Sequence, residues 1–526
     1  MKAERLTLSL TIALLLGLGV APLLAMFTAS VTVDGGFSLA HYQTLFTAER
    51  TWWLLGRSLL LASLTALGAA LLGVPLGVLF GKTDLSCRRI FTFLFTVPLL
   101  LPPYVLAIAW SGLLGREGWL GRLLGSPVAE SSSAWLFGLP GCAWVLTTVF
   151  LPVVMLVTIA FLHTVDPRLE EAGRLAARWP RILRGITLPT VARGIVASTL
   201  LTFLLALGEF TVPMYLRYDV FPVESLTQFS AFYDFSAATA AALPLALVTL
   251  AVLMLERLDV RAPTVPTAPA GGMVPIPLGG TRPWWLALTG LLCVTLVILP
   301  LGALILESSL FAFAETSTRA MDALLRSLLY GAVGATALVV LGFFVGYLLH
   351  ARALPLAGTV DFFTLFLLVL PSPVIGIGLI GLWNRPATAW LYASPAIVLF
   401  GYVAQYVALT SRITAAALAQ VPPSLGEAAV LMGAGWFRQL AFIITPLMGR
   451  GLLLAWLVAY IFCLRDTGIA MLVYPPGHDT LPVRLFTLMA NSPFERVAAL
   501  CVLLIAATLL PLMVLGLLWM RWRPAT

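Results

Sequence analysis

Three ionisable residues lie within long apolar runs, where a charge is costly unless it serves a purpose. Glu209 falls in the run 194–216, and the neighbours Arg465 and Asp466 fall in the run 449–474. At membrane depth such groups usually face a bundle interior or an aqueous path. We predict that Glu209 and Asp466 line a translocation path or its external gate, and that Arg465 partly neutralises them. A structural ion pair or a polar contact at a helix end is the alternative.

Prolines also interrupt the apolar runs. Pro102 and Pro103 stand in one run, and Pro371 and Pro373 stand in another. Proline frees backbone carbonyls and kinks a helix, so Pro102 and Pro371 are predicted to line the same path or to allow rocking. Simple packing kinks are the alternative.

Motifs for chemistry are weak by comparison. Residues 77–83 (GVLFGKT) are one residue too short for a phosphate loop and end an apolar run. There is no HExxH or GxSxG pattern, and His and Tyr do not gather at metal spacing. The five cysteines form no CxxC pair. We expect a chain that is not an enzyme and has no metal site or cofactor of its own.

The elements that carry these residues must be membrane helices. The chain is 60% hydrophobic and 10% charged, with a mean hydropathy of +1.00, which excludes a soluble domain. The fold class is therefore all-α integral membrane, with about twelve spans. We place the spans, within a few residues, at 6–28, 58–81, 90–114, 137–163, 194–216, 236–256, 284–307, 327–349, 359–383, 389–411, 449–474 and 497–520.

Charge and repetition organise these spans. The net charge of +8 reflects Lys and Arg in loops on one side, which predicts cytoplasmic N- and C-termini rather than nucleic-acid binding. Arg57 and Arg326 are 269 positions apart and open matching RSLL segments, whereas Pro189 and Pro446 are 257 apart. We therefore predict two homologous six-helix domains, related as parallel repeats. The domains are 1–258 and 284–526, joined by a Pro/Gly-rich cytoplasmic linker at 259–283.

Each half carries one polar loop before its fifth span, at 168–190 and at 425–447. We expect a short helix led by an acidic residue, then a turn, then a proline before the next span. Small residues would let another protein approach closely, so these loops are predicted docking elements. The residues concerned are Glu170, Glu171, Ala172, Ala176 and Pro189 in the first loop, and Glu427, Ala428, Ala429, Gly433 and Pro446 in the second.

The loop pair resembles the EAA loop of ABC importer permeases, which forms the coupling helix for the ATPase. The second copy follows the pattern EAA-x3-G-x9-I-x-x-P, whereas the first has Glu171 at the first Ala and Ala176 at the usual Gly. Segments 208–216 and 462–490 resemble fused permeases of the ferric-iron importer group. The resemblance implies a type I ABC permease in a bacterial inner membrane. Its implied partners are a periplasmic binding protein and two copies of an ABC ATPase, which would hold ATP and Mg²⁺.

Other interpretations stay open. The same machinery could carry thiamine, a polyamine or another small ligand. A secondary transporter of the major-facilitator type also has two six-helix halves, and the loop 81–89 superficially resembles its signature. That class does not explain the two EAA-like loops. A membrane-embedded enzyme lacks any supporting motif.

Overall fold

The structure is a computed structural model of the 526-residue chain and describes residues 2–33, 36–231, 235–259, 274–351 and 356–521. In that part of the chain, nine helices are long and apolar enough to cross a membrane, or up to twelve if each of three bent pairs is one span. Two short strands, β1 (Thr32–Val33) and β2 (Gly36–Phe37), pair antiparallel, with Thr32 opposite Phe37 and Val33 opposite Gly36. The all-α membrane fold is confirmed.

The chain packs as two compact units. Unit 1 comprises residues 1–48, 224–246 and 311–526, and unit 2 comprises residues 49–223 and 247–310. The units do not coincide with the predicted halves, because the first span of each half packs in the unit of the other. Of the predicted linker, residues 260–273 lie outside the described residues.

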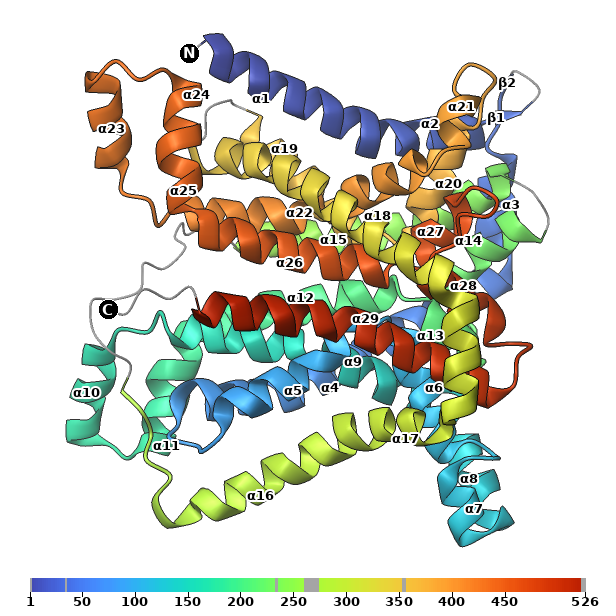
Figure 1. Ribbon diagram of the computed structural model, residues 1–526, viewed down its shortest axis with the longest axis horizontal. Helices are drawn as coiled ribbons and strands as arrows, with labels where there is room; N and C mark the ends of the chain where they lie inside the picture. The colour runs from blue at the N-terminus through green and yellow to red at the C-terminus, as the bar shows by residue number, and fades with distance from the viewer. Residues whose placement is uncertain (1, 34–35, 232–234, 260–273, 352–355, 522–526) are drawn as a thin grey trace. The chain divides into compact units, whose positions relative to one another are not determined.

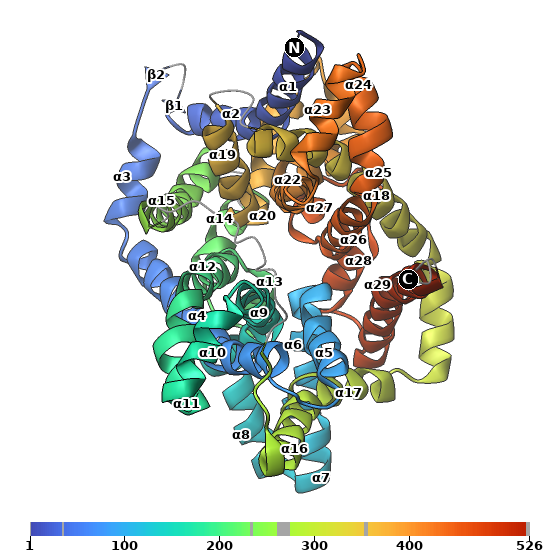
Figure 2. The same ribbon diagram turned by 90° about the vertical axis from the view of Figure 1, so that its left-hand side faces the viewer.

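Unit 2 is built around α4, which packs along α9 and α12 (Figures 1 and 2). From the second half it includes α16 and α17, which pack on α5 and α6. Helices α14 (Phe221–Ser230) and α15 (Phe235–Asp259) run from one unit into the other. The other elements of unit 2 are α4 (Glu49–Lys82), α5 (Arg88–Leu100), α6 (Pro103–Leu114), α7 (Trp119–Leu124), α8 (Ser126–Leu136), α9 (Leu139–Leu162), α10 (Pro167–Ala176), α11 (Trp179–Ile182), η2 (Leu183–Thr187), α12 (Leu188–Leu207), α13 (Thr211–Tyr215), η3 (Gly279–Thr281), α16 (Arg282–Cys293), η4 (Val294–Ile298) and α17 (Leu299–Glu307).

Unit 1 is built around α22, which packs against α19 and α26. From the first half it includes α1 and α2, and α2 packs on α20. Its elements, besides the strands, are α1 (Lys2–Leu15), η1 (Leu16–Val20), α2 (Ala21–Ser30), α3 (Ala40–Thr47), α18 (Leu310–Ala351), α19 (Ala357–Val369), α20 (Ser372–Trp383), α21 (Ala389–Tyr392), α22 (Ala396–Leu418), α23 (Pro423–Leu431), α24 (Trp436–Gln439), η5 (Leu440–Ile444), α25 (Thr445–Leu447), α26 (Gly449–Arg465), α27 (Gly468–Val473), α28 (Leu481–Leu488) and α29 (Phe494–Arg521).

Glycines set the closest helix approaches in both units. A Cβ on Gly77 of α4 would lie 2.7 Å from Thr158 of α9, and one on Gly346 of α18 would lie 2.2 Å from the Thr414 hydroxyl of α22. Gly77 and Gly346 are 269 positions apart, as are Gly73 and Gly342. Small residues four apart let helix backbones meet in the absence of a hydrophobic driving force. The repeat therefore preserves a helix-packing interface.

Prolines explain the π-helical turns. The four five-residue π segments, η1, η2, η4 and η5, each end two residues before a proline. These prolines are Pro22, Pro189, Pro300 and Pro446. Because proline has no N–H, the preceding turn cannot keep its ordinary hydrogen-bond register, and a wider turn takes its place. Pro189 and Pro446 thus fix the same distortion after each polar loop.

Several predicted spans differ from the structure. The run 90–114 bends by 102° between α5 and α6, and the run 359–383 bends by 107° between α19 and α20. These bends fall at Pro102 and Pro371, as the proline pattern predicts. The run 194–216 breaks after Leu207, and 449–474 breaks after Arg465. The helix expected over 389–411 begins at Ala396, because Pro395 precedes its first turn.

Candidate functional site: two docking loops

The first polar loop forms α10, α11 and η2 before α12, with α10 beyond the N-terminal end of α12 (Figure 1). Helix α10 begins at Pro167, and the Asp166 carboxylate accepts a hydrogen bond from Arg168 N at 3.0 Å. Proline at the first position and Asp at the cap are both favoured at helix starts. The expectation that the helix begins at Glu170 is therefore wrong by three residues.

The second loop repeats this plan with α23, α24, η5 and α25 before α26. Helix α23 begins at Pro423, so the expectation that it begins at Glu427 is also wrong. The turns differ between the loops. Gly433 takes the left-handed conformation, with φ of +78°, and follows Met432, the C-cap of α23. Its counterpart Ala176 is the last residue of α10, and Ala177 is extended with φ of −149°. The first loop thus needs no glycine, which explains Ala176.

Most of the predicted coupling residues lie on the surface of their loops. Those with exposed side chains or backbone are Glu171, Ala172, Ala176, Pro189, Glu427, Ala428, Gly433 and Pro446. The exceptions are Ala429, which is buried, and Glu170, which is fully buried. Leu175 and Leu431 project from the two loops with exposed fractions of 92% and 87%. Both side chains are thus accessible for contact with another protein.

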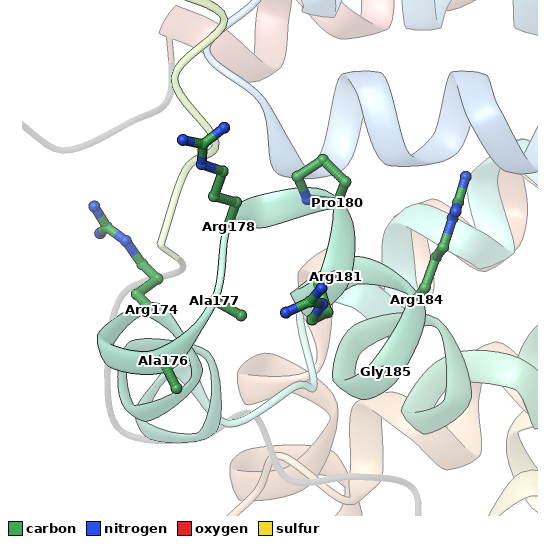
Figure 3. A pocket seen from close by; sticks show the side chains of 8 residues that line it. All are labelled: Arg174, Ala176, Ala177, Arg178, Pro180, Arg181, Arg184 and Gly185. Carbon is green, nitrogen blue, oxygen red and sulfur yellow. The ribbon is translucent and has the colours of Figure 1, made fainter.

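The two loops present different chemistry. A hollow of about 880 Å³ lies in the first loop, and Figure 3 shows its wall of arginines. The four arginines are Arg174, Arg178, Arg181 and Arg184. A smaller hollow of about 560 Å³ in the second loop has one arginine among apolar side chains. Its lining residues are Leu425, Ala428, Ala429, Met432, Ala434, Arg438, Phe442 and Ile443. One loop therefore offers guanidinium groups, and the other offers an apolar surface.

Glu170 has partners that the pattern did not reveal. Its carboxylate is paired with the Lys82 ammonium and accepts a hydrogen bond from Thr187 Oγ1 at 2.8 Å. In the sequence, Lys82 falls only within the incomplete phosphate-loop pattern of residues 77–83. One signal could have singled it out, because Lys2 and Lys82 are the only lysines in a chain that otherwise uses arginine.

The predicted path carboxylates occupy equivalent breaks. Glu209 lies between α12 and α13 and accepts a hydrogen bond from Thr211 N at 2.8 Å. Asp466 lies between α26 and α27, is 4% exposed, and accepts hydrogen bonds from Tyr406 Oη at 2.8 Å and Ala470 N at 2.9 Å. Each carboxylate thus accepts a hydrogen bond at the start of a short helix. This is the alternative interpretation from the sequence, in which these residues make polar contacts at helix ends. The Arg465 guanidinium lies 5.0 Å from the ring centre of Phe462. Lining of a path by these residues stays a prediction.

The RSLL repeat forms a clasp at the far end of each unit from its docking loop. In unit 2, Arg57 Nε donates to Asp219 O at 3.0 Å, and Phe221 N donates to Ser58 Oγ at 2.7 Å. In unit 1 the same contacts join Arg326 to Asp479 O at 3.1 Å and Leu481 N to Ser327 Oγ at 2.6 Å. The repeated sequence is therefore repeated geometry.

The two clasps are surrounded by different groups. The Arg57 guanidinium lies over the rings of Trp53 and Tyr218, at 4.3 and 3.9 Å from their centres. Unit 1 instead has an ion network, in which Arg484 binds Asp322 at 2.7 Å and Asp479 at 2.6 Å. Hydrogen bonds that Arg484 donates to these two carboxylates, Asp479 first, raise the pKa of Arg484 above its usual range.

Part of this chain is similar to a known protein family. Residues 73–262, which include the first docking loop, match the family model described as binding-protein-dependent transport system inner membrane component. Residues 73–262 are therefore similar to the inner membrane permeases of binding-protein-dependent transport systems, and the fold is that of a type I ABC permease.

Similarity to particular relatives extends further along the chain. A putative ferric transport system permease protein of Haemophilus influenzae is 22% identical over 490 residues, covering 89% of this chain and 77% of that protein. The ferric transport system permease protein of Actinobacillus pleuropneumoniae is 22% identical, covering 74% and 59%. A probable molybdenum ABC transporter permease of Haloferax volcanii is 35% identical over 162 residues, covering 31% and 57%.

Proposed function

We propose that this chain is the membrane subunit of an ATP-driven importer, whose docking loops 168–190 and 425–447 each receive one copy of an ABC ATPase. The duplicated loop architecture carries this proposal. Each loop places a short helix with an exposed leucine, Leu175 or Leu431, ahead of a proline-induced π turn. The first π turn leads directly into α12, whereas α25 and a bend of 78° separate the second from α26. Movement of a partner against either helix would thus be passed to α12 or α26.

The surface chemistry specifies what the partner must offer. Four arginines in the first loop favour carboxylates, because guanidinium and carboxylate groups form paired, charge-assisted hydrogen bonds. The apolar hollow of the second loop favours a buried hydrophobic side chain. On this proposal the loops and both termini face the cytoplasm of a bacterial inner membrane, and a periplasmic binding protein delivers cargo on the opposite face. ATP and Mg²⁺ bind the ATPase.

Ferric iron is the proposed cargo. Two relatives that align with 89% and 74% of this chain are named as ferric transport permeases. Among shorter matches are permeases named for molybdenum and sulfate, so those oxyanions are the competing cargoes to test, beside thiamine and polyamines.

Reconstitution in vesicles tests the proposal. The permease, its genomically adjacent ATPase and a binding protein preloaded with ferric iron are combined, with ATP on the ATPase side. We expect iron uptake that needs ATP and the binding protein. Uptake driven by an ion gradient without the ATPase would instead identify a secondary transporter. Parallel vesicles with molybdate or sulfate test the cargo separately from the mechanism.

A further inference from the structure

A buried ion pair joins the first docking helix to the core of unit 2. The Lys82 ammonium pairs with the Glu170 carboxylate, and their side chains are 1% and 0% exposed. Lys82 is the last residue of α4, and Glu170 lies in the first turn of α10. Thr187, the last residue of η2, donates to the other carboxylate oxygen of Glu170 at 2.8 Å. One carboxylate therefore ties together α4, α10 and the entrance to α12.

The end of the linker is fastened to the same turn. Ile276 N donates to Lys82 O at 2.8 Å, and Asp84 N donates to Ile276 O at 3.3 Å. Leu278 N donates to the Asp84 carboxylate at 2.9 Å. These bonds form a short parallel bridge between residues 82–84 and 276–278. The segment that leads into α16 thus covers the turn that carries Lys82.

Burial makes this contact resistant to opening. Taking α10 away from α4 would leave the Lys82 ammonium and the Glu170 carboxylate, both now buried, without their charge partners. A buried pair is a weak source of net stability, but the loss of one partner is strongly unfavourable. The contact therefore acts against separation of the two helices rather than as a large contribution to folding.

Among the residues that the structure describes, the second loop has no equivalent contact. The position that corresponds to Lys82 is Ala351, the one that corresponds to Thr187 is Ile444, and Glu427 is exposed. Unit 1 holds its loop through α24 instead, where Trp436 Nε1 donates to Tyr347 Oη at 3.0 Å. Helix α23 itself buries only Ala429. The first docking helix is thus fixed to the core by charge, whereas α23 is attached at its ends.

We infer that Lys82 is a positioning residue that makes α10 a rigid extension of α4, so that the two docking loops transmit partner movement unequally. When a partner displaces α10, α4 and the attached linker move with it. When a partner displaces α23, α23 shifts relative to α26 before α26 itself moves. The coupling role rests on the proposed function. The rigid attachment of α10 does not depend on it.

Limited trypsin digestion of the purified permease alone tests the attachment. Cleavage after Arg174 or Arg178 reports opening of the first loop, and cleavage after Arg438 reports the second. We expect Lys82→Met and Glu170→Gln to speed the first cleavage roughly tenfold, as for loss of local protection, and to leave the second unchanged. The matched control Glu427→Gln should change neither rate. Wild-type cleavage in both Lys82→Met and Glu170→Gln would overturn the inference.

Removal of both charges separates positioning from folding. A buried pair can often be replaced by neutral residues without loss of stability, so Lys82→Met/Glu170→Gln should remain folded, as measured by its thermal midpoint and elution as a single species. In vesicles with the ATPase we expect ATP hydrolysis to persist while cargo moved per ATP falls severalfold. Normal cargo per ATP in this folded double variant would reject unequal transmission.

The charge-exchanged variant Lys82→Glu/Glu170→Lys supplies the rescue. Trypsin should cleave the first loop of this double variant more slowly than that of Lys82→Glu or Glu170→Lys alone. Equally fast cleavage of the double variant and both single variants would contradict the pairing. The digestion needs no partner protein. Its failure would reject the attachment alone, and ATP-independent transport would reject the proposed function alone.

Discussion

The glycine contact between α18 and α22 gives the sharpest stability prediction. A methyl group at Gly346 would lie 2.2 Å from Thr414 Oγ1 and 2.7 Å from Ser411 O. Thr414 Oγ1 donates to Gly342 O at 2.8 Å, so a displaced threonine would also lose an interhelical hydrogen bond. Overpacking of this kind costs about 1–3 kcal/mol. Alanine also gains up to about 1 kcal/mol over glycine inside a helix, which would mask part of that cost.

A control glycine removes the masking. Gly290 lies in α16, and a Cβ added there would have nothing within 4 Å. Gly290→Ala therefore measures only the stabilisation that alanine gives a helix relative to glycine. The difference between Gly346→Ala and Gly290→Ala therefore isolates packing, and we expect about 1–3 kcal/mol. Gly77→Ala should behave like Gly346→Ala, because its Cβ would lie 2.7 Å from Thr158.

Thermal unfolding of the three purified variants in one detergent measures this difference. We expect lower midpoints for Gly346→Ala and Gly77→Ala than for Gly290→Ala. Equal midpoints for all three would refute the argument that close helix approach at these glycines determines the packing of both units.

Three further predictions concern the clasps and the loops. Ser58→Ala and Ser327→Ala should each lower the free energy of unfolding by about 1–3 kcal/mol, and by similar amounts, because each substitution leaves a buried backbone N–H without its acceptor. Unequal losses of unfolding free energy in chemical denaturation would contradict the equivalence of the two clasps. Gly433→Ala should lower the free energy of unfolding by about 1–2 kcal/mol, because alanine is strained at the positive φ of this position, and Gly433→Asn should lower it less. If this turn positions the loop, Gly433→Ala should also transport less than Gly433→Asn; equal transport by the two variants would argue against that role. Asp166→Ala should cost about 1 kcal/mol as a lost helix cap and speed trypsin cleavage in α10, whereas Asp166→Asn should not.

Much of this organisation was predictable because it depends on local patterns. Apolar run length gave the spans, and proline position gave the bends at Pro102 and Pro371. Constant spacing between matching residues gave the duplication, which the paired clasps at Arg57 and Arg326 repeat in three dimensions. Each of these depends on residues close together in sequence or on the comparison of one half with the other.

Long-range pairing was not predictable from the same patterns. No local signal shows that α1 and α2 pack in unit 1 while α16 and α17 pack in unit 2. Likewise, Glu170 was expected at a surface, but Lys82 lies 88 positions before it and contacts it only through tertiary packing. The helix starts differ from the expectation for another reason: Pro167 and Pro423 each occupy the first turn of a helix and lie ahead of the acidic residues that suggest a start.

Cross-linking of the two docking helices to an ATPase tests the central claim most directly. Single cysteines replace the exposed Leu175 and Leu431 in a background lacking Cys87, the exposed native thiol. In native membranes, both positions should react only with reagents that reach the cytoplasm and should cross-link to the ATPase. Labelling of either position by an impermeant reagent added outside, or the absence of any cross-link from both, would contradict the account.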